Sequence, residues 1–140
     1  MRAVILDTGV ANLSSLAFAV KRLGVEPIIT REAAEIRAAD RIFLPGVGTA
    51  RAAMAAIEER GLADLIREAT QPVLGICLGE QAIGEAFGAR LENLAEVHHG
   101  VCSDIRVVAD DPLFDGLGTG FRAGRYHSWV VSAEGLPDCL

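Results

Sequence analysis

The chain has 140 residues, of which 51% are hydrophobic and 23% charged, a composition typical of one globular domain. This apolar content argues against intrinsic disorder, and no run of about 18 apolar residues is present that would span a membrane. The net charge of −6, without any cluster of Lys or Arg, argues against nucleic acid as a partner. Asp7 interrupts the first apolar run too early for a signal peptide, so we expect a cytoplasmic protein.

The first 88 residues alternate between short apolar runs and segments of helical period. The pattern predicts strands at 3–6, 25–30, 42–44 and 73–76, and helices at 13–23, 32–39, 49–61, 62–70 and 79–88. Asn12 and Gly24 are expected to cap the first helix, and Pro27 indicates that the second strand lies at a sheet edge. This alternation predicts a three-layer α/β fold, in which helices flank a mostly parallel sheet.

From residue 89 the pattern changes to strands joined by turns, which we expect at 91–97, 103–108 and 121–131. His98 and His99 fall in a predicted loop between the first two. These strands are interpreted as an antiparallel extension that runs to Leu140 without a concluding helix. The whole chain is predicted to form a single domain, 1–140.

The most specific motif is Gly75-Ile76-Cys77-Leu78-Gly79-Glu80-Gln81, which joins a predicted strand to a predicted helix. A Cys with glycine two residues to either side matches the nucleophile elbow, a turn too tight for side chains at the flanking positions. The positive end of the following helix favours the thiolate, and the Leu78 N–H is placed to bind an oxyanion. The alternative interpretation is a buried structural cysteine.

A second candidate is the glycine-rich segment Pro45-Gly46-Val47-Gly48, which follows the predicted strand 42–44. Ligands bind at the carboxyl edge of a parallel sheet, so this loop and the turn at Cys77 are expected to face one crevice. Backbone N–H groups in the loop can then serve an oxyanion or a substrate. A plain strand-to-helix turn is the alternative.

Cysteines and histidines, the usual zinc ligands, are few, namely Cys77, Cys102, Cys139, His98, His99 and His127. The odd number of cysteines and the absence of a CxxC pair argue against a disulfide framework and a zinc site. Neither a carboxylate nor a cysteine lies at metal-ligand spacing from the histidines. We therefore expect neither a metal nor a cofactor.

With these motifs the chain resembles the class I (triad) glutamine amidotransferases over essentially its whole length. Residues 1–79, including Leu44-Pro45-Gly46-Val47-Gly48-Thr49-Ala50, resemble the glutaminase subunit of imidazole glycerol phosphate synthase. Residues 80–140, including Arg125-Tyr126-His127-Ser128, resemble the glutaminase component of anthranilate or aminodeoxychorismate synthase. The seam falls inside the shared motif around Cys77, which is typical of a chimera, designed or otherwise assembled.

The resemblance implies a flavodoxin-like fold and a glutaminase. Cys77 would attack the side-chain amide of glutamine, while the Leu78 N–H and the backbone of Gly46, Val47 and Gly48 would stabilise the oxyanion and hold substrate. Ammonia would pass to a synthase partner, either a barrel-shaped cyclase of histidine biosynthesis or a chorismate-using component of tryptophan or folate biosynthesis.

The resemblance also assigns the residues that grip substrate. Gln81 would contact the bound glutamine, and backbone groups of Ser128 and Trp129 would hold its α-amino and carboxylate ends.

The sequence departs from the family at the catalytic base, a His followed two residues later by Glu. None of the three histidines has Glu at that position. Nucleophilic catalysis of this kind needs a base within hydrogen-bond reach, so we expect a domain incomplete at its C-terminus with no more than trace glutaminase activity. One alternative is a non-catalytic α/β scaffold with a structural or redox-sensitive Cys77. Another is a Cys hydrolase in which His98 or His99 approaches Cys77.

Overall fold

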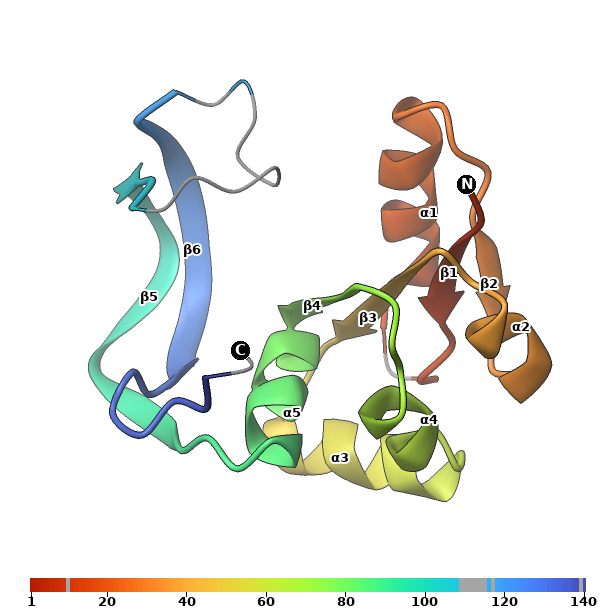
Figure 1. The fold of residues 1–140 in the computed structure, drawn as a ribbon. Coiled ribbons are helices and arrows are strands. Elements are labelled where there is room, and N and C mark those ends of the chain that lie inside the picture. The colour runs from red at the N-terminus through yellow and green to blue at the C-terminus, as the bar shows by residue number, and fades with distance from the viewer. Residues whose placement is uncertain (10, 109–115, 117, 139) are drawn as a thin grey trace. The chain divides into compact units, whose positions relative to one another are not determined.

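The computed structural model describes the chain except residues 10, 109–115, 117 and 139, and the side chains of 50 and 51. The chain divides into two compact units, Met1–Leu91 with Val131–Leu140, and Glu92–Val130. The elements of the first unit, drawn in Figure 1, are β1 (Ala3–Leu6), α1 (Leu13–Arg22), β2 (Ile28–Thr30), α2 (Ala33–Arg37), β3 (Arg41–Gly46), α3 (Ala50–Glu59), α4 (Ala63–Arg67), β4 (Val73–Cys77) and α5 (Leu78–Ala86).

The first unit is built on a parallel sheet with the strand order β2-β1-β3-β4. In its register Val4 pairs with both Ile28 and Ile42, and Ile42 pairs with Val73. The short strand β2 lies at an edge directly after Pro27, as predicted, because proline has no N–H for a second neighbour. The predicted parallel sheet is therefore confirmed.

Helices cover both faces of this sheet, and β1 shows how the sequence divides between them. Ala3 and Ile5 pack with Ala17 and Val20 of α1 on one face. The alternate residues of β1 point to the other face, because successive side chains of a strand alternate. There they join a larger core whose buried members are Val4, Leu6, Ile36, Ala39, Ile42, Leu44, Ile57, Leu62, Ile66 and Ala82. The predicted three-layer α/β fold is confirmed.

The capping of α1 follows its sequence. The Asn12 side chain accepts a hydrogen bond from the Ser15 N–H at 3.2 Å. Gly24 follows the helix with a φ of +80°, the left-handed conformation that glycine adopts without steric cost. The predicted helices at 32–39 and 62–70 are shorter in the structure, where α2 and α4 have five residues each and no side-chain N-cap.

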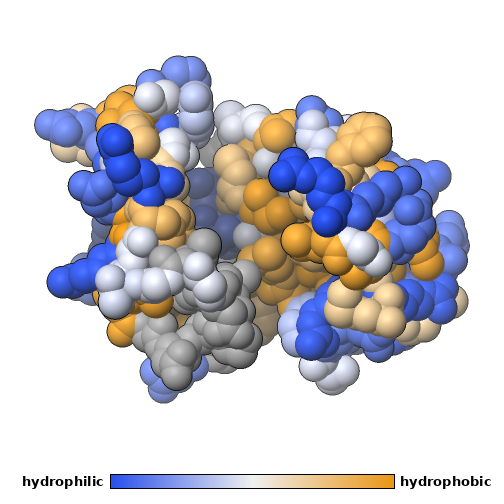
Figure 2. Space-filling view, turned by 90° about the horizontal axis from the view of Figure 1, so that it is seen from above, coloured by the Kyte–Doolittle hydropathy of each residue, from blue (hydrophilic) through white to orange (hydrophobic). Residues whose placement is uncertain are grey.

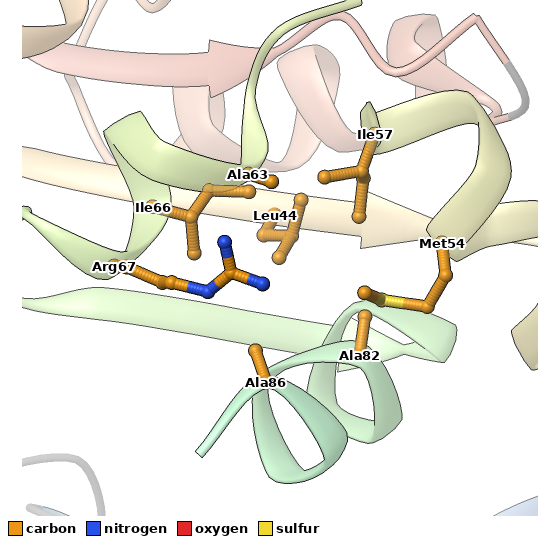
Figure 3. A pocket seen from close by; sticks show the side chains of 8 residues that line it. All are labelled: Leu44, Met54, Ile57, Ala63, Ile66, Arg67, Ala82 and Ala86. Atoms are coloured by element: carbon orange, nitrogen blue, oxygen red, sulfur yellow. The ribbon is translucent and has the colours of Figure 1, made fainter. Parts of the chain in front are cut away.

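A small cavity lies in the larger core, between β3 and the helices α3, α4 and α5 (Figure 3). Its volume is about 10 Å³, enough for about one water molecule. The side chains of Met54, Ala82 and Ala86 border it, and Arg67 reaches toward it from α4. The Arg67 guanidinium also forms a salt bridge with the Asp64 carboxylate at 3.1 Å, so its positive charge is paired with a residue that does not line the cavity.

Apolar side chains also reach the surface, as the orange areas in Figure 2 show. In the first unit Ile29 and Leu74 are 44% and 38% exposed. Ile29 pairs with Ile5, Ile5 with Phe43, and Phe43 with Leu74. Ile29 and Leu74 therefore belong to one row of side chains across the sheet. Its α1 face is thus less completely covered than the face against α2 to α5. Among the described residues, no helix is both long enough and apolar enough to cross a membrane.

The second unit is formed by β5 (Leu91–Arg106) and β6 (Gly120–Val131), which make a two-stranded sheet of their own. Their contacts run antiparallel, from Asp104 with Arg122 to His98 with His127. The prediction of two strands separated by a loop at 98–99 is wrong, since β5 is continuous there. Gly100 has a φ of +75°, which glycine adopts without strain, so β5 can contain an irregular residue here and continue beyond it.

Candidate active site

Cys77 occupies the turn between β4 and α5. It is the last residue of the strand and the N-cap of the helix, and its thiol is exposed. With φ of 56° and ψ of −115°, it is the one residue other than glycine with positive φ in the described part of the chain. Such backbone strain costs about 1–3 kcal/mol and is concentrated at functional sites. The strained, exposed position favours a reactive cysteine over a buried structural one.

The glycines beside Cys77 are required by close backbone contacts, as the elbow motif predicted. A Cβ on Gly75 would lie 2.6 Å from the Glu80 nitrogen, well inside van der Waals contact. A Cβ on Gly79 would overlap the carbonyl oxygen of Leu44 in β3. Nothing in the sequence indicates the role of Leu44, because it acts through its backbone.

Gly46 brings the second candidate segment to the same place. It is the register partner of Cys77 in the β3–β4 ladder, and a Cβ on it would lie 2.8 Å from the Leu78 Cβ. The sequence placed Pro45 and Gly46 in a turn, but both belong to β3. The glycine-rich segment therefore lies against the elbow, one strand away.

The rest of that segment leads into α3. Val47 is 51% exposed, and Gly48 has a φ of +103°, which a side chain would disfavour. Thr49 then caps α3, its hydroxyl accepting a hydrogen bond from the Ala52 N–H at 3.2 Å. The loop is thus fixed at one end by the β-ladder and at the other by a helix cap.

Two further predicted site residues lie on α5. Leu78 is buried and is the first residue of α5. Because it begins the helix, its N–H has no acceptor within the helix. Gln81 is 4% exposed and lies four residues after Cys77, about one helical turn along. The structure therefore brings together Cys77, Leu78, Gln81 and the segment 46–48.

Ser128 and Trp129 lie on β6 of the second unit, and His98 and His99 lie on β5. Ser128 is half-buried and Trp129 is 47% exposed. The substrate-binding role of Ser128 and Trp129 and the approach of His98 or His99 to Cys77 stay predictions. Cys139 lies outside the described residues. The residues that the structure does describe contain no group of three or more His, Cys, Asp or Glu suited to a metal.

A comparison with known protein families supports the interpretation of the elbow and the glycine-rich strand end beside it. The family model for class-I glutamine amidotransferases matches residues 4–140. The chain belongs to the class-I glutamine amidotransferase family. The match covers both units, so the family assignment extends from β1 to the last residue.

Curated relatives point to one branch of the amidotransferases. The imidazole glycerol phosphate synthase subunit HisH of Pectobacterium atrosepticum is 62% identical over 84 residues, covering 60% of this chain and 43% of the relative. The subunit HisH of Salmonella typhimurium is 56% identical over 100 residues, covering 69% of this chain and 51% of the relative. The chain thus spans about half the length of these relatives.

Solved amidotransferase structures share the fold. A glutamine amidotransferase from Thermotoga maritima superposes with a TM-score of 0.69 at 16% identity, covering 99% of this chain and 64% of that one. Another glutamine amidotransferase gives a TM-score of 0.73 at 18% identity, covering 96% of this chain and 75% of that one. At such identities the likeness concerns the fold alone.

Proposed function

We propose that this chain is a glutaminase domain that releases ammonia from glutamine, with Cys77 as the nucleophile. The observation that carries the proposal is the exposed Cys77 held at positive φ directly opposite Gly46. No such strain or glycine-rich neighbour is needed for a structural cysteine. Membership of the amidotransferase family supports the same role.

The chemistry we propose is the one that the family resemblance implies, placed on the residues around the thiol. The Cys77 thiol gives up its proton and the thiolate attacks the carboxamide carbon of glutamine; the C–N bond then breaks, and the nitrogen takes up that proton and leaves as ammonia. Water then cleaves the γ-glutamyl thioester to glutamate and restores the thiol. The Leu78 N–H and the backbone of Gly46, Val47 and Gly48 hold the oxyanion that forms in both steps.

Substrate recognition is assigned to three further residues. Gln81, one turn into α5, contacts the bound glutamine, and backbone groups of Ser128 and Trp129 hold its α-amino and carboxylate ends. The support for Gln81 is its burial at the base of the elbow. For the other two residues it is the family resemblance of residues 80–140.

The partner we propose is the cyclase subunit of an imidazole glycerol phosphate synthase, and the pathway is histidine biosynthesis. Relatives named as the HisH subunit of that synthase, 56% to 62% identical, support this choice. Co-purification of the chain with a cyclase subunit from one of those organisms tests it. Binding to a chorismate-using synthase component instead would move the proposal to tryptophan or folate biosynthesis.

We further propose that these 140 residues alone turn over glutamine only at a trace rate, because no His-x-Glu is present to serve as the base. Steady-state ammonia release at the rate of a complete glutaminase would contradict this. If His98 or His99 were the base, replacing both with Ala would abolish such turnover.

A glutamine analogue that carries a diazoketone in place of the amide tests the function itself. We expect mass spectrometry to find it attached to Cys77, and Cys77→Ser to abolish the labelling. Absence of labelling on a folded chain would support the alternative, a non-catalytic α/β scaffold with a structural or redox-sensitive cysteine.

A further inference from the structure

Two histidines far apart in the sequence meet on the second unit. His98 of β5 and His127 of β6 face each other across the two strands, with ring centroids 5.8 Å apart and ring planes at 68°. Both side chains are half-buried. The adjacent residues His99 and Tyr126 form a second ring pair, with centroids 5.3 Å apart. Because neighbouring residues of a strand point to opposite faces, the two pairs lie on opposite faces of the ribbon.

Arg125 is the cationic residue nearest to His127 along β6. Arg125 follows the same face as His127, two residues away along β6. Its Nε donates a hydrogen bond to the Ser103 hydroxyl at 2.9 Å, so the guanidinium is directed to a residue five positions beyond His98. Neither imidazole takes part in a salt bridge within the described residues.

The two rings lie close to, but slightly beyond, the spacing of two imidazoles on one metal ion. With metal–nitrogen distances of about 2.1 Å, two imidazoles on one tetrahedral or octahedral ion have ring centroids roughly 4.5–5.2 Å apart. Metal binding thus requires the two side chains to rotate toward each other from their 5.8 Å separation. Imidazole nitrogen is a preferred ligand of zinc, nickel and copper, whereas Mg²⁺ and Ca²⁺ prefer oxygen.

We propose that His98 and His127 form a two-histidine site for a divalent transition-metal ion of the zinc and nickel class. No third His, Cys, Asp or Glu joins the pair among the described residues, so water fills the remaining positions. Such a site is open and exchangeable, unlike the closed four-ligand sites that hold a fold together. The proposal does not rest on the proposed glutaminase function. It was not visible in the sequence, because the strand pairing, and not the local spacing, brings the ligands together.

Zinc chloride titrated into the 140-residue chain, followed by NMR of the histidine ring protons, tests the site. With only three histidines the signals are few. We expect the His98 and His127 signals to move together with one midpoint, to return on addition of EDTA, and the His99 ring to respond less. Independent midpoints for His98 and His127, or a response shared by His98 and His99, would overturn the proposal.

Variants separate the cross-strand pair from its neighbours. His127→Ala should raise the midpoint of the His98 response by about tenfold or more, and His98→Ala should do the same to His127. His99→Ala, which removes a ring contact of the opposite face, should leave the midpoint unchanged. An unchanged His98 midpoint in His127→Ala would contradict the site. The titration of the unaltered chain remains decisive if a variant fails to fold.

Discussion

The Cα of Gly79, in the first turn of α5, lies against the carbonyl oxygen of Leu44 in the neighbouring strand β3. This contact joins the helix that follows Cys77 to the strand that carries Gly46. The position of the thiol relative to the glycine-rich segment is therefore set by backbone packing, in which side chains take little part.

Gly79→Ala tests that packing. Helix propensity alone would make the substitution stabilising by about 1 kcal/mol. Because the added methyl group overlaps the Leu44 carbonyl, we expect instead a loss of about 1–3 kcal/mol in the free energy of unfolding. Chemical denaturation measures the change.

Gly84→Ala is the matched control, since it lies in the same helix but its added methyl group would come nearest to the Val131 side chain, at 2.8 Å. This contact is longer than the overlap with the Leu44 carbonyl and involves a side chain, not backbone, so the loss should be smaller than for Gly79→Ala. Equal losses would mean that the Leu44 contact has no special role.

The backbone strain at Cys77 should lower the stability of any variant that keeps a side chain at this position. Cys77→Gly should be more stable than Cys77→Ala by about 1 kcal/mol, because glycine adopts the φ of 56° without steric cost. Both variants lack the thiol, so their difference in melting temperature isolates the backbone effect. A more stable Cys77→Ala would show that the turn is not strained.

Much of the first unit could be predicted from its sequence, because its signals are local. Asn12, Gly24 and Pro27 each act through neighbouring backbone, and their predicted roles as caps and edge marker are confirmed. The elbow was predicted from the spacing of two glycines around Cys77, and the contacts of both explain that spacing.

The features that were missed depend on pairing between distant segments. The Pro-Gly-x-Gly pattern predicts a turn at Gly46, yet pairing with Cys77 keeps this residue in β3. His98 was placed in a loop because Gly100 follows closely, yet the long partner strand β6 holds β5 together through it. A single sequence carries no signal for either pairing.

Thr49 should position the glycine-rich segment through its helix cap. Thr49→Ala removes the acceptor of the Ala52 N–H, and we expect it to cost about 1 kcal/mol in the free energy of unfolding. It should also slow labelling of Cys77 by the diazoketone analogue, because the end of the loop is released. Thr49→Ser keeps the hydroxyl and should restore both properties. If the serine variant behaves like the alanine variant, the cap does not position the loop.

We propose Cys77 as an activated nucleophile within a glutamine site. Cys77 and Cys102 are both exposed, so their relative rates of alkylation by iodoacetamide compare reactivity with little influence from access. Measured by mass spectrometry on the native chain, Cys77 should react faster than Cys102, and added glutamine should slow Cys77 alone. Equal rates at the two cysteines, unaffected by glutamine, would contradict the role of Cys77 as an activated nucleophile in a glutamine site.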